Sequence, residues 1–182
     1  MHRPLILASA SPVRLQLLSA AGLAVTAVPA RVDEQAIRDG LRAEDANPRD
    51  VADMLAETKA RKVAEKHPDA LVLGCDQILE FDRQVWSKPE TMAEARAQLW
   101  ALRGRTHRLL SAAVIYDRAE PIWRHVGTVR LTMRDFSDAY LDELGGRDFE
   151  DRYYDKQFFL DFNANVTFSK NLSFYLNLNN LT

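Results

Sequence analysis

The segment Ala70-Leu71-Val72-Leu73-Gly74-Cys75-Asp76 is a continuous apolar run that ends in a carboxylate. Runs of this length without polar alternation are typical of a central strand that is buried on both faces of a sheet. Patterns with helical spacing precede and follow the run in the sequence. The segment therefore predicts an α/β domain in which residues 70–75 form a central strand and Asp76 follows at its carboxyl end.

Before this segment, short apolar runs alternate with helical patterns. Ser11 followed by Pro12 is typical of an N-cap and a first helical position, and Gly22 is typical of a helix end. Leu15 and Leu18 have the spacing of an inward-facing stripe. The expected elements are strands over residues 5–8 and 25–28, a helix from Pro12 to Gly22, and a long helix from Pro48 to His67.

After this segment, the pattern continues with strands and two further helices. Two short apolar runs on either side of Asp82 and Arg83 predict a hairpin. Thr91 and Glu94 form a capping box for a helix that ends at Gly104. The remaining expected elements are strands over residues 109–116 and 122–133 and a short helix that begins at Ser137. Together these elements predict a mixed sheet with flanking helices.

The composition excludes several classes of protein. The chain has 182 residues and a formal net charge of -2, so no general basic field favours nucleic acid. Cys75 is the only cysteine, which excludes an internal disulfide and favours a reducing compartment. The apolar run over residues 5–8 is too short for a signal peptide, and no stretch is long enough for a transmembrane helix. We therefore expect a soluble cytoplasmic protein.

Residues 151–182 differ in composition from the rest of the chain. They contain six of the seven asparagines and a single alanine, Ala164. Apolar and polar residues alternate over residues 158–168 and again over residues 172–178, which predicts a long amphipathic β-hairpin. The sequence therefore divides into a domain of residues 1–146 and a hairpin tail of residues 147–182.

The loop before the first helix has the features of an anion site. The N–H groups at the start of a helix point toward the preceding loop, where Ser9 adds a hydroxyl. Arg14 lies in the first turn, where its charge opposes the helix dipole, and an anionic ligand would offset that cost. The alternative is a capped surface helix with an incidental arginine.

Two carboxylates follow the predicted strands. Asp76 lies at the carboxyl end of the central strand, where α/β proteins commonly bind ligands, and Glu34 lies in a loop after the second strand. Together they have the chemistry of a site for Mg²⁺ or Mn²⁺. The alternatives are an aspartate that caps a neighbouring turn and a solvated Asp33-Glu34 pair.

Two lysines add positive charge to this set. Lys88 precedes Pro89, which restricts its backbone, whereas Lys59 lies in a charge-rich helix where a surface salt bridge is the alternative. His107 lies on a predicted strand, where a core or rim position is the simpler interpretation. Carboxylates for a metal and cations for phosphates are what phosphoryl or nucleotidyl chemistry needs. The members of the set are Ser9, Arg14, Glu34, Lys59, Asp76 and Lys88.

Six segments within residues 3–144 resemble, in the same order, the Maf family of nucleotide pyrophosphatases. They are LILASASPVRLQLL, VDE, AETKARKVA, LVLGCDQILEFDRQVWSKP, EARAQLWALRGRTH and RLTMRDFSDAYLD. The resemblance implies an α/β fold related to the inosine-triphosphate pyrophosphatases, with a central cleft between two lobes. It also implies hydrolysis of a nucleoside triphosphate to the monophosphate and pyrophosphate with a divalent metal, which removes unwanted or modified nucleotides.

The resemblance also implies roles for individual residues. Asp76 and Glu34 correspond to the catalytic and metal-binding carboxylates, and Gln77 is similar to the residue of the branch that acts on 7-methyl-GTP. The residues expected to bind the substrate are Ser9, Arg14, Lys59, Gln77, Lys88, Arg105 and His107. The expected partner is the nucleotide substrate. We expect no binding to nucleic acid or to a membrane, and the sequence leaves open whether the protein forms a homodimer.

Three features depart from the family pattern. Val13 replaces the first of two arginines that usually follow the proline, and Arg83 stands where a turn glycine is common. No glycine-rich strand or closing helix is visible after Gly146, and residues 151–182 instead resemble the C-terminal strands of TonB-dependent outer-membrane receptors. The alternatives are therefore a catalytically impaired nucleotide-binding protein and a hybrid chain whose tail derives from an outer-membrane barrel.

Overall fold

The computed structural model describes residues 3–145, 162–169 and 172–178. The chain forms two compact units. One contains Met1–Pro89 and Ala97–Asp135, and the other contains Glu90–Arg96 and Phe136–Thr182. The boundary expected between residues 146 and 147 lies outside the described residues.

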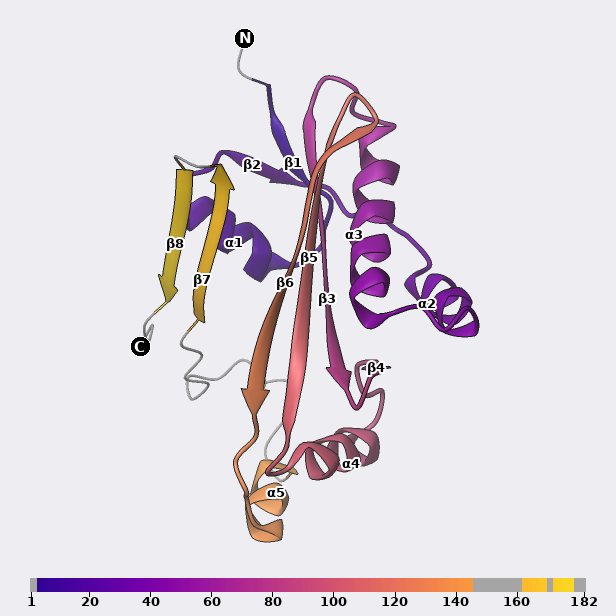
Figure 1. Ribbon diagram of the computed structural model, residues 1–182, viewed down its shortest axis with the longest axis vertical. Helices are drawn as coiled ribbons and strands as arrows, with labels where there is room; N and C mark the ends of the chain where they lie inside the picture. The colour runs from indigo at the N-terminus through magenta and orange to yellow at the C-terminus, as the bar shows by residue number, and fades with distance from the viewer. Residues whose placement is uncertain (1–2, 146–161, 170–171, 179–182) are drawn as a thin grey trace. The chain divides into compact units, whose positions relative to one another are not determined.

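Six strands form a mixed sheet. They are β1 (Leu5–Leu7), β2 (Val25–Ala27), β3 (Leu71–Phe81), β4 (Gln84–Trp86), β5 (Thr106–Asp117) and β6 (Glu120–Thr132). The order is β2-β1-β3-β5-β6, and β4 pairs with the end of β3 (Figure 1). β1 is parallel to β2 and β3, whereas β5 is antiparallel to β3 and β6. The expected mixed sheet is confirmed, and the apolar run lies in its central strand β3. The expectation that Asp76 follows the end of this strand is wrong, because β3 continues to Phe81 through its pairing with β5 and Asp76 lies in its middle.

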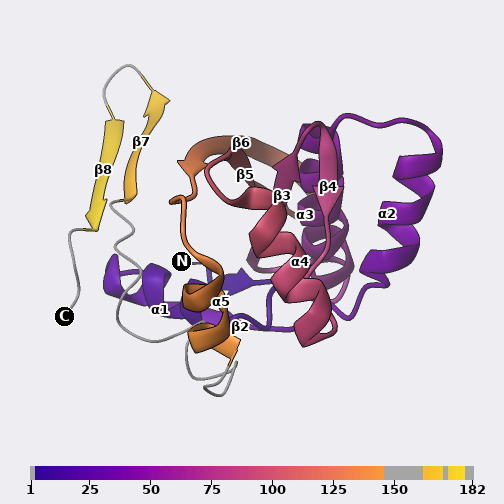
Figure 2. The same ribbon diagram turned by 90° about the horizontal axis from the view of Figure 1, so that it is seen from below.

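The described helices are α1 (Pro12–Ala20), α2 (Glu34–Ala43), α3 (Pro48–Ala64), α4 (Met92–Leu102) and α5 (Asp138–Gly145). Helix α3 packs along β3 and β5, and α2 lies beside α3 (Figure 2). None of these helices is both long enough and apolar enough to cross a membrane.

Helix α2 differs from the expectation that Glu34 lies in a loop. Asp33 is the N-cap, and its carboxylate accepts a hydrogen bond from the N–H of Ala36 at 3.0 Å. Glu34 is therefore the first residue of a helix. Ile37 and Leu41, one helical turn apart, are half-buried and pack against the core, so the segment does carry a short apolar stripe that the expectation of a loop overlooked.

Helix α3 and strand β3 approach each other closely at Gly74, and this contact sets the distance between them in the core. Leu55 on α3 and Val72 on β3 are fully buried at this contact. At Gly74, an added Cβ would lie 2.1 Å from the carbonyl oxygen of Ala56 and 2.7 Å from the nitrogen of Ala60. Because both atoms belong to the helix backbone, only glycine permits this distance between α3 and β3.

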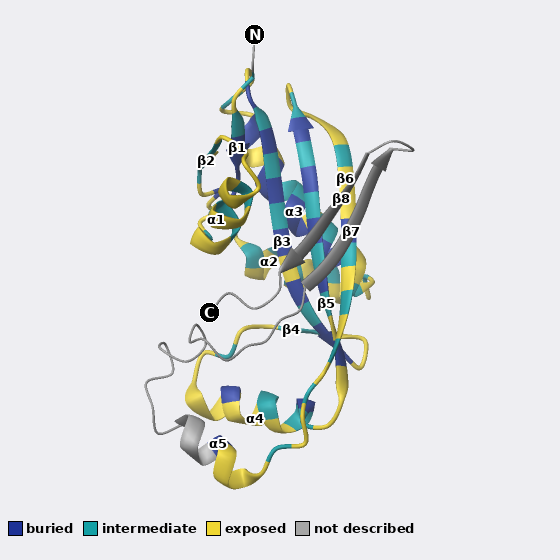
Figure 3. Ribbon diagram, turned by 90° about the vertical axis from the view of Figure 1, so that its left-hand side faces the viewer, coloured by how far each residue is buried: buried dark blue, intermediate teal, exposed yellow. Residues whose placement is uncertain are grey.

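The inward stripe expected on α1 is not formed. Leu15 and Leu18 are only partly buried, and Val13 is 46% exposed. Much of α1 is accordingly exposed (Figure 3). The helix packs beside β2, which has three residues and offers little apolar surface. The start of the helix is as expected, because Ser11 is its N-cap and Pro12 its first residue.

The expected hairpin at Asp82 and Arg83 joins β3 to β4. Both residues have positive φ, 50° and 65°, as a type I′ turn requires. Arg83 therefore adopts a left-handed conformation that costs an L-residue about 1–2 kcal/mol. The carboxylate of Asp82 accepts a hydrogen bond from Arg105 at 2.8 Å, which helps to hold the turn.

The tail contains a separate antiparallel sheet of two strands, β7 (Phe162–Ser169) and β8 (Leu172–Leu178). Its register pairs apolar positions with each other, as in Phe162 with Leu178, and polar positions with each other, as in Asn163 with Asn177. The expected hairpin is confirmed over these two strands. The alternation expected over residues 158–161 lies outside the described residues.

Candidate active site

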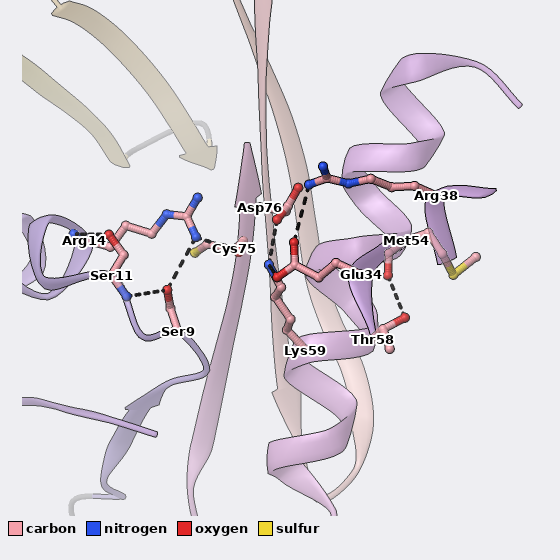
Figure 4. Close-up of polar contacts among 10 residues, drawn as sticks. All are labelled: Ser9, Ser11, Arg14, Glu34, Arg38, Met54, Thr58, Lys59, Cys75 and Asp76. Carbon is pink, nitrogen blue, oxygen red and sulfur yellow. Dashed lines mark hydrogen bonds and ion pairs between the residues drawn. The ribbon is translucent and has the colours of Figure 1, made fainter. Parts of the chain in front are cut away.

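The loop between β1 and α1 places Arg14 at the free edge of β3. Because β1 pairs with β3 only as far as Leu73, the carbonyl of Cys75 on that edge is open to other donors. Arg14 Nη1 donates to this carbonyl at 2.9 Å and to Ser9 Oγ at 3.4 Å (Figure 4). Ser9 is buried, and its Oγ also accepts from the N–H of Ser11 at 3.1 Å. The structure thus brings Ser9 and Arg14 together at the start of α1.

Three elements contribute to an ionic cluster of Lys59, Asp76 and Glu34 (Figure 4). Lys59 Nζ on α3 donates to Oδ1 of Asp76 on β3 at 2.6 Å and lies 2.8 Å from Oε1 of Glu34 at the start of α2. Lys59 and Asp76 are 8% and 5% exposed, so the alternative of a surface salt bridge does not describe Lys59. Glu34 is more open, with a side-chain exposure of 41%. The cluster therefore has one buried and one accessible carboxylate.

Burial changes the acidity of Asp76. It is the main cause that raises the pKa of this carboxyl above its ordinary value; Lys59 lowers the pKa, and Glu34 raises it further. Asp76 Oδ2 is buried and accepts no hydrogen bond from the described residues. A buried acceptor without a donor costs about 1–3 kcal/mol. Oδ2 is therefore a position at which a bound group would be stabilising.

The two carboxylates fit a divalent metal. Within the described ranges, no group of three or more His, Cys, Asp or Glu side chains is arranged to hold a metal by itself. Mg²⁺ commonly binds one or two carboxylates and takes its other ligands from water and substrate phosphates. Asp76 Oδ2 and the accessible Glu34 supply that number.

Sequence reasoning missed Arg38, which joins the cluster from α2 (Figure 4). Its Nη2 lies 3.4 Å from Oε2 of Glu34, and its side chain is only 19% exposed. The one available signal is its position four residues after Glu34, which places both side chains on one face of a helix. That signal depends on recognising α2 as a helix.

Four predicted substrate-binding residues lie apart from the cluster. In the described part of the chain, no hydrogen bond or ion pair joins these four residues to the cluster. Gln77 follows Asp76 in β3, so its side chain points to the other face, where Nε2 donates to Ser111 Oγ at 2.8 Å. Lys88 is exposed, and Arg105 pairs with Asp82 and lies 4.3 Å over the ring of Phe81. His107 is buried, which lowers its pKa.

A cavity of about 370 Å³ opens elsewhere on the face of the sheet that α3 covers. Glu80 in its lining lies four residues after Asp76 on β3, on the same face, and is 3% exposed. Arg108 donates to Glu80 Oε1 at 2.6 Å, so this buried carboxylate has a charged partner. None of the predicted site residues lines the cavity. The lining residues are Asp45, Ala46, Asn47, Pro48, Glu80, Arg83 and Arg108.

The arrangement has the chemistry to bind a phosphate anhydride. Arg14 offers a guanidinium beside a helix start on one side of β3, and Lys59 offers an ammonium within reach of two carboxylates. Cations and oriented N–H groups neutralise phosphate oxygens, and carboxylates hold a metal or orient a water. Phosphoryl transfer depends mainly on such positioning and charge neutralisation.

Comparisons with known proteins agree with this chemistry. A family model described as "Maf-like protein" matches residues 4–147. A "Nucleoside triphosphate pyrophosphatase" of Ruegeria pomeroyi is 55% identical over 141 residues, which are 78% of this chain and 71% of the relative. A "7-methyl-GTP pyrophosphatase" of Mesorhizobium japonicum is 49% identical over the same shares. The solved structure of a HAM1 protein from Coxiella burnetii has a TM-score of 0.46 and 15% identity, and the match covers 74% of this chain and 75% of that one.

Proposed function

Since this chain belongs to the Maf family, whose named relatives are hydrolases of acid anhydrides, we propose that it hydrolyses a nucleoside triphosphate to the monophosphate and pyrophosphate. The observation that carries the proposal is the contact of one buried lysine with two carboxylates, Lys59 with Asp76 and Glu34. A second cationic group, Arg14, lies beside the same strand and the start of α1.

In the proposed reaction, the oxygen of a water molecule bonds to the α-phosphorus while the bond from that phosphorus to the bridging oxygen breaks. The proton of the water passes to one of the two carboxylates, Asp76 or Glu34, and pyrophosphate leaves. Arg14, Lys59 and the N–H groups at the start of α1 bind the phosphates. Asp76 and Glu34 would hold Mg²⁺ or Mn²⁺, which would neutralise charge on the phosphate oxygens when bound. Because its pKa is raised, Asp76 is a stronger base than an exposed aspartate, which suits a group that accepts a proton.

The finer proposal is that the substrate is 7-methyl-GTP or another modified nucleotide, in a cytoplasmic house-cleaning role. Gln77 after the active-site aspartate supports this choice by resemblance. Relatives from Mesorhizobium japonicum and Rhizobium meliloti, each 49% identical, carry the name 7-methyl-GTP pyrophosphatase. A homodimer remains part of this proposal, without nucleic acid or membrane as partner.

The second candidate is a nucleotide-binding protein with impaired catalysis. It is favoured by Val13, which offers no charge where the family pattern has an arginine, and by the end of the family match at residue 147. The resemblance of residues 151–182 to outer-membrane receptor strands stays a prediction. Binding of nucleotide without turnover would identify this second candidate.

Pyrophosphate release from a panel of ordinary and modified nucleoside triphosphates tests the proposal. We expect release with Mg²⁺, none after EDTA, and none from Asp76→Asn, which keeps the fold because Glu34 still pairs with Lys59. An active Asp76→Asn protein would contradict the assignment of Asp76. A folded wild-type protein that binds nucleotide but releases no pyrophosphate would replace the first candidate with the second.

A further inference from the structure

We propose that Arg38 is a phosphate-binding residue of this site, with a guanidinium that contacts the triphosphate, and later pyrophosphate, from the α2 side. The inference rests on the proposed function, because it assigns a substrate contact to a residue of the same site. Neither the sequence patterns nor the family segments quoted above include Arg38 among the functional residues.

The first argument is that Arg38 has unused donors. A guanidinium has five N–H donors, and among the described residues Arg38 makes a single hydrogen bond, from Nη2 to Glu34 Oε2 at 3.4 Å. This distance is at the long end of hydrogen bonds. Arg38 Nε is buried and has no hydrogen-bond partner among the described residues. A guanidinium held in this way is suited to a further acceptor.

The second argument is the direction of the side chain. An arginine paired at i,i+4 on an outer helix commonly lies in solvent, but the side chain of Arg38 is 19% exposed. Figure 4 shows its guanidinium turned toward Asp76 and Glu34. Its charge is close enough to lower the pKa of Asp76. Arg38 therefore lies where the carboxylates would meet a metal and its phosphate ligands.

The third argument is the balance of charge. Lys59 carries one positive charge against the two negative charges of Asp76 and Glu34, so these three groups have a net charge of -1. Arg38 brings the cluster to neutrality. When a divalent cation binds the carboxylates, Arg38 and Lys59 are no longer needed to neutralise them. Both cations are then free to bind the phosphate oxygens, for which a guanidinium has matching bidentate geometry.

The rival explanation is that Arg38 only positions Glu34. The two roles differ in their effect on metal binding. A positioning residue supports Glu34 as a metal ligand, so its loss weakens the metal site. A phosphate-binding residue competes with the metal for Glu34 before substrate binds, so its loss leaves metal affinity unchanged or increases it.

The experiment compares the full chain with Arg38→Gln, Arg38→Lys and the control Arg42→Gln, an exposed arginine on the same helix. Mn²⁺ affinity is measured by electron paramagnetic resonance, and pyrophosphate affinity in the presence of Mn²⁺ by titration calorimetry. The KM for the best nucleotide of the panel is measured in parallel. We expect Arg38→Gln to weaken pyrophosphate binding and to raise KM about tenfold or more. Arg38→Lys recovers part of this loss, and Arg42→Gln matches the wild type.

Two results would overturn the inference. In one, Arg38→Gln binds pyrophosphate as well as Arg42→Gln does. In the other, Arg38→Gln loses Mn²⁺ affinity in the same proportion as pyrophosphate affinity, which assigns the positioning role. A wild-type protein that binds pyrophosphate without turnover contradicts the proposed function and leaves the binding comparison intact, so the two failures are distinguishable.

Discussion

Asp76 and Lys59 each place a charge where an isolated charge would be costly. Their contact at 2.6 Å offsets part of that cost, and Glu34 adds a third charge at the accessible side. Burial nevertheless dominates at Asp76, because its pKa is raised in spite of the lysine. The carboxyl of Asp76 is therefore less acidic than that of an exposed aspartate. This difference affects the expected pH dependence of activity and of stability.

The first prediction concerns the dependence of activity on pH. In the proposed mechanism the carboxylate form of Asp76 is the active one, so kcat/KM is expected to fall as the pH falls through the pKa of Asp76. Because that pKa is raised, we expect the acid limb of the profile to lie above the ordinary value of 3.8. The measurement is log kcat/KM against pH at metal concentrations below saturation, because a bound cation would itself lower the pKa of Asp76. An acid limb that coincides with the ordinary value would assign the titration to a different group.

The same shift has a defined sign in the unfolding equilibrium. A carboxyl whose pKa is raised in the folded state binds its proton more tightly there than in the unfolded chain. The contribution of Asp76 to the free energy of unfolding is most favourable below pH 3.8, the ordinary pKa, and is lost as the pH rises through the raised pKa. Urea unfolding of the wild type and Asp76→Asn at several pH values checks this. The wild type is expected to lose stability relative to the variant as the pH rises.

At the scale of elements, the distance between α3 and β3 decides the geometry of the site. Helix α3 carries Lys59 and strand β3 carries Asp76, and their backbones meet at Gly74. A side chain at Gly74 would push α3 away from the strand two residues before Asp76. Lys59 and Asp76 of the candidate site are thus held at their observed distance by a residue that has no side chain.

A prediction for Gly74 follows from this contact. We expect Gly74→Ala to destabilise the protein by at least about 1–3 kcal/mol, because the new Cβ meets helix backbone that cannot give way locally. A displacement of 1 Å between Lys59 and Asp76 would also reduce kcat about a hundredfold. Urea unfolding and steady-state kinetics measure the two effects.

Gly40→Ala is the matched control, since a Cβ at Gly40 on α2 meets nothing within 4 Å. This variant is expected to keep its activity and to gain up to about 1 kcal/mol of helix stability. If both glycine variants behaved alike, the close contact of α3 with β3 would not be what positions the site.

At the scale of the whole molecule, the tail differs from the rest in its hydrogen bonding. Strands β7 and β8 pair with each other in a sheet of their own, and the family match ends at residue 147. We therefore expect removal of residues 147–182 to leave pyrophosphate release and the unfolding midpoint unchanged. Loss of solubility or a lower midpoint in the shortened protein would show that the tail contributes to the core.

The sequence predicts those parts of the fold that local patterns determine. The start of α1 and the central strand follow from Ser11-Pro12 and from the apolar run of residues 70–75, whose signals lie within a few neighbours. The signal of helix α2 is short, because it is limited to the N-cap Asp33 and to Ile37 and Leu41 at helical spacing. The extra residues at the ends of β5 and β6 depend on the pairing of the two strands with each other. The lost stripe of α1 has the same cause, since its burial depends on what lies opposite.

The candidate site likewise contains residues that local sequence patterns indicate and features that only tertiary contacts determine. Residue types and motifs indicate Asp76, Lys59 and Glu34, but whether Lys59 lies in solvent or beneath a helix is set by the approach of α3 to β3. Arg38 has no motif of its own and becomes visible only when α2 is known to be a helix. Gln77 lies on the opposite face because side chains alternate along a strand.

Cys75, whose carbonyl accepts a hydrogen bond from Arg14, offers a chemical probe of unfolding. Burial raises the pKa of its thiol to about 11, whereas the ordinary value is 9.0. Since the thiolate is the reactive form, alkylating reagents meet about a hundredfold fewer thiolates in the folded chain than in the unfolded one. The thiol of Cys75 is therefore expected to react more slowly in the folded chain than in the unfolded chain. The rate of thiol labelling therefore reports the opening of β3, the strand that also carries Asp76.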